Sequence, residues 1–207
     1  LYQFSTLKGI SGKVELQLQV IDNNINLLST KTLVSVDGNL STDKRIFIRA
    51  SSDKKYFAIL FITQGNDKTK SILNIFGFDA TLSPKYSRRF GLDYAADDVY
   101  INNLECDNEG NAFALIDFPK DGKKPRDYRP RNYFLYAYFT ANDNMLEFPI
   151  GKDSVFVNDL GLVVNNYAKT VNVAGFYSDK SDNKALGTVY CKLDIPNANL
   201  SVKKFDA

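Results

Sequence analysis

Histidine is absent from the 207-residue chain. Mechanisms that need an imidazole, such as a Ser-His-Asp triad, a Cys-His pair or a His-ligated zinc ion, are therefore excluded. Long apolar runs are lacking too, because no stretch of about 18 uncharged apolar residues occurs, which excludes a membrane-spanning helix. The glycines form neither a phosphate-binding motif nor a G-x-S-x-G nucleophile elbow.

Cysteine is scarce, with Cys106 and Cys191 as its two occurrences. A small secreted fold held by disulfides would carry more cysteines at regular spacings. Both lie in alternating apolar stretches, which favours two buried free thiols. A disulfide between them, or a reactive thiol, is the alternative.

The charges nearly cancel, since 26 basic and 24 acidic residues give a net charge of +2. No nucleic-acid partner is therefore expected. The composition, 44% hydrophobic and 24% charged, is that of an ordinary globular protein with a sizeable core.

Short apolar segments dominate the chain, and helical periodicity is nearly missing. Alternating or continuous apolar residues are broken by clusters of Asn, Asp, Gly and Ser, which predicts an all-β protein of about 15 short strands. One hairpin recurs about every 57 residues. Its first strand closes on a residue with a side-chain oxygen that starts a turn, namely Asp22, Asp79, Thr140 and Asp194.

A second hairpin type lies between these copies, at residues 46–61, 99–118 and 155–177. Four antiparallel strands per repeat are typical of a β-propeller blade, and an evenly spaced β-sandwich is the alternative. We predict a single propeller domain or propeller fragment, with a partial blade at residues 1–36 and complete blades at 45–91, 98–150 and 154–206. The partial blade lacks its first strand, which suggests a piece of a larger propeller or completion by another chain, such as a second copy. A closed propeller of four blades is the alternative.

The alternating pattern also predicts core positions between blades or against the channel. These are Leu18, Val20, Ile75, Phe113, Leu115, Leu135, Val173 and Leu193.

Several segments resemble a pattern in uncharacterised bacterial propeller-like proteins, in which a GFYS strand, a polar loop and a G-x-x-Y/F strand follow one another. The matching segments are residues 174–180, 187–190 and 192–194, with turns at 107–111 and 52–55. This resemblance implies a secreted or cell-envelope protein, and it supplies no catalytic residues.

The densest basic stretch is residues 120–131, the connector between the second and third strands of one blade. It is either a solvated connector or a contact for an acidic protein or acidic glycan, because arginine donates bidentate hydrogen bonds to anions. The binding residues predicted there are Lys123, Lys124, Arg126, Tyr128, Arg129 and Arg131.

The acidic candidates are Asp97, Asp98, Glu105, Asp107 and Glu109. A full calcium-loop ligand series is missing, so no metal site and no cofactor are predicted. The pattern predicts a non-enzymatic binding module that presents loops on the propeller. The alternative is a carbohydrate-active enzyme, which needs two carboxylates about 5–10 Å apart at the channel.

Overall fold

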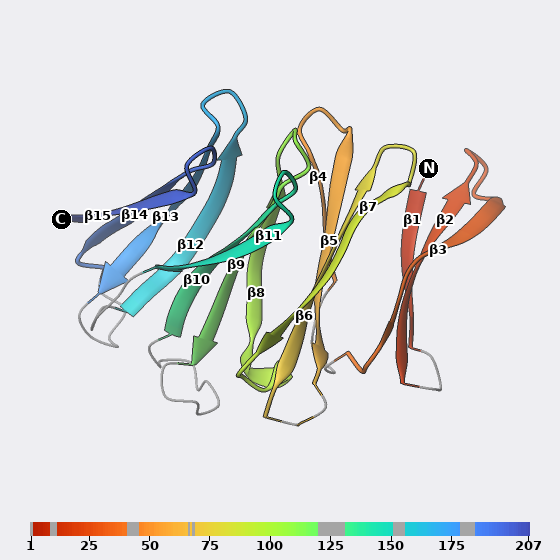
Figure 1. Cartoon of the computed structure of the whole chain (residues 1–207), viewed down its shortest axis with the longest axis horizontal. Helices are drawn as coiled ribbons and strands as arrows, with labels where there is room; N and C mark the ends of the chain where they lie inside the picture. Colours follow the sequence, from red (N-terminus) through yellow and green to blue (C-terminus); the bar gives the residue numbers. More distant parts are fainter. Residues whose placement is uncertain are drawn as a thin grey trace.

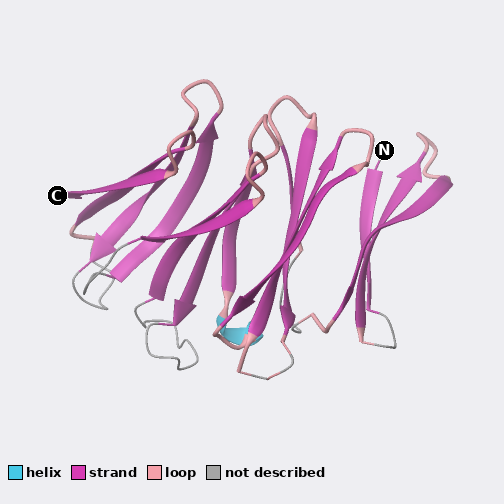
Figure 2. Cartoon of the chain, viewed as in Figure 1, coloured by secondary structure: helices cyan, strands magenta, loops and turns pink. Residues whose placement is uncertain are grey.

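The computed structural model describes residues 2–8, 12–40, 46–65, 67, 69–119, 131–150, 156–178 and 185–207. Apart from one 3-10 turn, η1 (Ala96–Asp98), the regular elements in these ranges are strands (Figure 2). The all-β prediction is confirmed. Within the described ranges we find no helix with the length and apolar character needed to cross a membrane.

The strands form four antiparallel sheets in chain order. The first sheet contains β1 (Tyr2–Lys8), β2 (Lys13–Ile21) and β3 (Leu27–Asp37). The second contains β4 (Phe47–Ala50), β5 (Tyr56–Gln64), β6 (Ser71–Asp79) and β7 (Pro84–Leu92). The third contains β8 (Tyr100–Cys106), β9 (Ala112–Pro119), β10 (Arg131–Phe139) and β11 (Asn144–Ile150). The fourth contains β12 (Phe156–Asn165), β13 (Thr170–Ser178), β14 (Gly187–Asp194) and β15 (Asn199–Asp206).

The sheets follow one another along the long axis of the molecule, and the first and last lie at opposite ends (Figure 1). Three apolar cores fill the spaces between successive sheets. Strand β5 contributes to two of these cores: Ile59 and Phe61 face the first sheet, whereas Leu60 and Ile62 face the third. A strand covered on both faces has a continuous apolar sequence, as β5 does.

The core positions predicted from alternation are buried, with one exception. Val20 is only half-buried, so that prediction is wrong. The β2–β3 register shifts between Val20 and Ile21, where β3 carries the extra residue Leu28, and Ile21 is buried at 9% exposure. A bulge disrupts the ladder locally and increases the twist of the paired strands, so strict alternation ends there.

The turn between the last two strands of a sheet is here called the outer turn. Aspartates start the outer turns of the first two sheets, as predicted. The Asp22 carboxylate accepts hydrogen bonds from the backbone N–H groups of Asn24 and Asn26, both at 2.8 Å. Asp79 accepts in the same way from Thr81 and Ser83. A side-chain oxygen thus satisfies backbone donors at these two reversals. At the other two positions, the Thr140 hydroxyl donates to the Asn111 amide oxygen, and Asp194 accepts from the side chain of Asn197.

Both cysteines are buried free thiols, which confirms the favoured prediction. Burial raises the pKa of Cys106 to about 12 and that of Cys191 to about 11. The reactive thiolate is therefore disfavoured at neutral pH.

Leu135 lies in the core between the third and fourth sheets, with 0% exposure. We expect Leu135→Ala to lower the free energy of unfolding by about 2–5 kcal/mol, because truncation leaves a cavity. Val163→Ala, at a position with 63% exposure, is the control and should change it little. Urea denaturation measures both, and equal effects would show that the Leu135 register is wrong.

Candidate functional site

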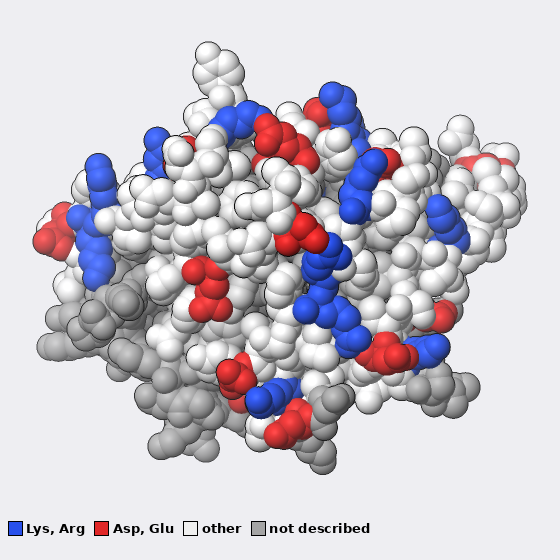
Figure 3. Space-filling model, in the orientation of Figure 1, with Lys and Arg blue, Asp and Glu red and all other residues white. Residues whose placement is uncertain are grey.

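The predicted basic site falls largely outside the described residues, which resume at 131. Lys123, Lys124, Arg126, Tyr128 and Arg129 therefore stay a prediction, and Arg131 begins β10. On the face in Figure 3, basic and acidic side chains of the described residues are interspersed.

The acidic candidates do not converge as a catalytic pair. Asp97 and Asp98 lie in η1, before β8, whereas Asp107 and Glu109 lie in the turn after it. At about 3.3 Å per residue, the two groups are roughly 25 Å apart, well beyond a carboxylate pair that flanks one bond. Glu105 is held by Arg49 of the neighbouring sheet, with Nη2–Oε1 at 2.7 Å and Nε–Oε2 at 3.1 Å.

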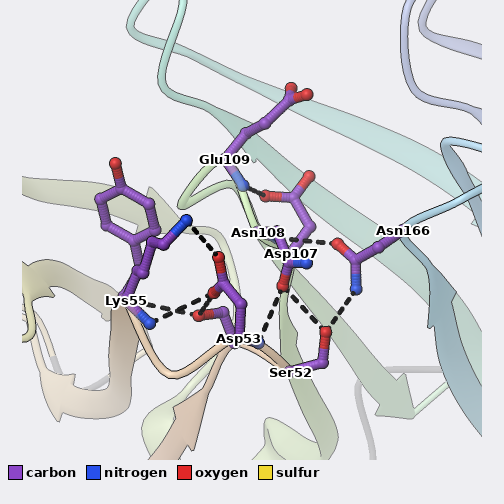
Figure 4. Close-up of polar contacts among 9 residues, drawn as sticks. Ser52, Asp53, Lys55, Asp107, Asn108, Glu109 and Asn166 are labelled. Carbon is purple, nitrogen blue, oxygen red and sulfur yellow. Dashed lines mark hydrogen bonds and ion pairs between the residues drawn. The ribbon is translucent and has the colours of Figure 1, made fainter.

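In the second, third and fourth sheets, the turn between the first two strands is here called the inner turn. These three inner turns meet in a polar network (Figure 4). Asn108 is at its centre: its amide oxygen accepts from the Ser52 hydroxyl at 2.9 Å and from the Asp53 N–H at 3.2 Å. The Asn108 N–H donates to the Asn166 amide oxygen at 2.7 Å, and Asn166 donates to the Ser52 hydroxyl at 3.1 Å. An ion pair between Glu109 and Lys169 adds a further link.

Asp107 stabilises the turn that carries Asn108. Its carboxylate accepts from the N–H groups of Glu109 and Asn111 and from the Asn111 amide, at 2.8–2.9 Å. Burial raises the pKa of Asp107 in spite of these hydrogen bonds. The carboxylate is fully engaged in its own turn, which is a structural role.

A cavity of about 280 Å³ adjoins this network, between the second and third sheets. Its walls are mainly aromatic, with a charged residue from each sheet. The lining residues are Tyr56, Phe57, Gly77, Phe78, Lys85, Tyr86, Glu109, Gly110, Tyr138 and Thr140.

Gly77 makes room for the ring of Tyr86, its partner in the β6–β7 register. A Cβ atom at position 77 would lie 2.1 Å from Cε1 and 2.2 Å from Cζ of Tyr86. The ring therefore lies flat across the backbone of β6, which only glycine permits. Its face meets the ring of Tyr138, with centroids 4.3 Å apart.

The Tyr86 hydroxyl is buried and has no hydrogen-bond partner within the described part of the chain. The residue is 7% exposed. Burial raises the pKa of Tyr86 well above its usual value, and the nearby Cys106, Tyr138 and Asp107 add to the shift. The hydroxyl is therefore protonated at neutral pH, a neutral group able to donate and to accept.

The neighbouring Tyr138 hydroxyl has a partner. It donates to Asp143 at 2.5 Å, and Asp143 also pairs with Arg88 of β7, with Nε–Oδ1 at 2.8 Å. Burial and the Asp143 hydrogen bond raise the pKa of Tyr138 to about 12. This chain of contacts joins the second and third sheets beside the cavity.

Sequence reasoning missed this cavity. The one signal in the sequence was Gly77 inside an apolar strand, since such a glycine often marks a close approach. The contact with Tyr86 depends on the β6–β7 register, which the repeat alone did not give.

No protein-family model matches the chain, and neither does any curated protein. Solved structures with a similar arrangement include Synechocystis apocarotenoid oxygenase, at 13% identity and a TM-score of 0.49. A chimera of this oxygenase with RPE65, in a trigonal crystal form, has 12% identity and a TM-score of 0.50. Each alignment covers 100% of this chain and 46% of the other, so the chain spans about half of their length. Identity this low shows the fold alone.

This comparison contradicts the prediction of a non-enzymatic binding module, because the similar structures are oxygenases, which are enzymes. The sequence repeat indicates only strands and turns, and the same fold occurs in both enzymes and binding proteins. The pattern thus held no information that could exclude catalysis.

A further similar structure is a cobalt-substituted form of the oxygenase, with 12% identity and a TM-score of 0.49. The chain contains no histidine. The described ranges also bring together no group of three or more Cys, Asp or Glu side chains that could hold a metal ion.

The unpartnered hydroxyl of Tyr86 should reduce the free energy of unfolding. We expect Tyr86→Phe to raise the free energy of unfolding by about 1–3 kcal/mol, the cost of an unsatisfied buried polar group. Tyr136→Phe is the matched control: Tyr136 is 5% exposed, but its hydroxyl donates to Glu147, so its removal should lower stability. Thermal unfolding by circular dichroism measures both, and an equal loss in the two variants would contradict the assignment.

Acid should destabilise the protein through its paired aspartates. Arg88 and then Tyr138 lower the pKa of Asp143 below its ordinary value of 3.8, so its contribution is present above that value and lost as the pH falls. Burial raises the pKa of Asp107, so this residue acts in the opposite direction. We expect Tm to fall below about pH 4, and Asp143→Asn to lower Tm at pH 7 while reducing the acid-dependent loss.

The control for this pH series is Asp93→Asn, at a carboxylate with 88% exposure. Its Tm profile should follow the wild type. A profile of Asp143→Asn that also follows the wild type would contradict the role of the Arg88 pair.

Proposed function

We propose that the four sheets are blades of a β-propeller and that the chain binds a small molecule in the cavity between its second and third blades. The sheets stand side by side along the long axis (Figure 1), and the chain covers 46% of the similar structure. The chimera with a TM-score of 0.50 supports the arrangement of blades, and the activity of the oxygenases is not carried over.

The use of equivalent faces supports a propeller. Ala58 of β5 lies beside Arg49 of β4, and Phe113 of β9 lies beside Glu105 of β8, so these residues hold equivalent positions. Ala58 belongs to the core between the second and third sheets, and Phe113 to the core between the third and fourth. The second and third sheets thus turn the same face to the sheet that follows them, as rotation about one axis requires.

The cavity between the second and third sheets is the observation that carries the binding proposal. It has the usual composition of a ligand site, with aromatic walls and few polar groups.

The direct test is a titration of the wild-type protein with 4-methylphenol, followed by amide NMR shifts. We expect shifts at Gly77, Gly110 and Thr140, which line the cavity. Thr140→Phe, which places a ring in the cavity, should abolish them. Thr30→Phe, at an exposed position of β3, is the control and should leave them unchanged.

Shifts that are scattered over the surface, or absent, would overturn the proposal. The same holds for shifts that persist in Thr140→Phe.

A further inference from the structure

The cavity between the second and third sheets also points to the class of its ligand, an inference that rests on the proposed function. We infer that the cavity takes a free α-amino acid with an aromatic or other apolar side chain. Lys85 binds the carboxylate of this ligand, Glu109 binds its ammonium group, and the aromatic walls contact its side chain.

The two charged residues that line the cavity have opposite signs and come from different sheets. Lys85 lies on β7 of the second sheet, whereas Glu109 lies in the inner turn of the third. Lys85 Nζ lies 3.0 Å from Asp79 Oδ2. Glu109 instead pairs with Lys169 of the fourth sheet. A ligand in the cavity thus meets a cation from one sheet and a carboxylate from the other, which complements a zwitterion.

Both charged groups are accessible to a ligand. The side chains of Lys85 and Glu109 are 47% and 53% exposed. Exposed ion pairs contribute little to stability, so a ligand can share or replace the partners of either group at small cost. The hydrogen bond to Asp79 raises the pKa of Lys85 above its ordinary value of 10.5, so Lys85 is a cation at neutral pH.

The turn that carries Glu109 is fixed against the cavity wall. The Glu109 N–H donates to the Asp107 carboxylate at 2.9 Å, and the Thr140 hydroxyl donates to the Glu109 carbonyl oxygen at 3.3 Å. The next residue, Gly110, has φ +83°, and a Cβ atom there would lie 3.3 Å from the ring of Tyr56. The Glu109 side chain extends away from the polar network of the inner turns (Figure 4).

Tyr56 provides a second polar group beside Lys85. Its electrostatic interaction with Lys85 adds to the raised pKa of that residue, so the two side chains lie close together. The ammonium group of Lys85 and the hydroxyl of Tyr56 both donate hydrogen bonds. Together they suit a carboxylate, which accepts two donors at once.

The walls and the volume of the cavity suit an apolar side chain. Phe57 stacks on Phe78 with ring centroids 5.2 Å apart, and the centroids of Tyr86 and Tyr138 are 4.3 Å apart. Such rings prefer offset-stacked or edge-to-face contacts with another ring. Benzene fits an apolar protein cavity of about 150 Å³. The cavity of about 280 Å³ therefore accepts a ring together with the backbone atoms of an amino acid.

The test compares L-phenylalanine with 3-phenylpropionate, which lacks the ammonium group, and with 2-phenylethylamine, which lacks the carboxylate. We expect L-phenylalanine to bind the wild-type protein about tenfold more tightly than either, because each analogue loses one charge-assisted hydrogen bond. L-Alanine should bind at least about tenfold more weakly than L-phenylalanine, because it lacks the ring. The dissociation constants come from amide NMR titrations.

Two variants assign the charged contacts. Lys85→Met should weaken L-phenylalanine and 3-phenylpropionate by about tenfold and change 2-phenylethylamine by less than about threefold. Glu109→Gln should weaken L-phenylalanine and 2-phenylethylamine by about tenfold and change 3-phenylpropionate by less than about threefold.

Two controls separate ligand contacts from loss of an ion pair. Lys169→Met breaks the pair with Glu109 but keeps the Glu109 carboxylate, so L-phenylalanine should bind as tightly as to the wild type or more tightly. Lys70→Met removes a lysine with 60% exposure that pairs with Asp93 and does not line the cavity, and it should bind L-phenylalanine like the wild type. A loss in Lys169→Met as large as that in Glu109→Gln would contradict the role of Glu109.

The outcomes distinguish the two proposals. If 4-methylphenol binds in the cavity but L-phenylalanine binds no more tightly than its two analogues, the amino-acid class is wrong and the small-molecule site stands. The same conclusion follows if Lys85→Met and Glu109→Gln weaken the three aromatic probes alike. If neither 4-methylphenol nor L-phenylalanine binds in the cavity, both proposals fail.

Discussion

The burial of both faces of each inner sheet is the constraint on which the rest of the structure depends. A lone four-stranded sheet with apolar faces exposes them to water, and burial stabilises it by about 25 cal/mol per Å² of apolar surface. Here the second and third sheets contribute residues to the cores on both of their sides. This packing brings the inner turns side by side, so that Asn108 can join Ser52 to Asn166. The polar network is thus a consequence of the apolar packing.

The cavity follows from the same packing, at the place where side chains are smallest. Across the second sheet, Ala58 pairs with Gly77, and Gly77 pairs with Tyr86. The equivalent pair in the third sheet is Phe113 and Ala137. The small residues Ala58 and Gly77 leave a space beside β5 and β6. The ring of Tyr86, from β7, occupies part of this space. What remains of that space is the cavity.

The sequence predicted the strands, the repeat and the outer turns because each depends on local chemistry. Asp22 and Asp79 cap their turns with their own carboxylates, whatever the distant chain does. The partial exposure of Val20 was not predictable, because the register shift beside it depends on pairing with β3. The cavity was missed for a related reason, since it needs the register of β6 and β7 and the packing of two sheets. The function class was also wrong, because strands and turns describe a scaffold that enzymes and binding proteins share.

Two buried tyrosines show how a hydroxyl group can either add to stability or reduce it. Tyr136 donates its hydroxyl to Glu147, so its buried oxygen has a partner. Tyr86 is equally enclosed but its hydroxyl stays unpaired, although phenylalanine would fill the same space without that cost. Folded domains have a net stability of only about 5–15 kcal/mol, so a cost of one or more kcal/mol at one atom is a substantial fraction. Packing does not require the oxygen, so the chain forgoes stability at this atom.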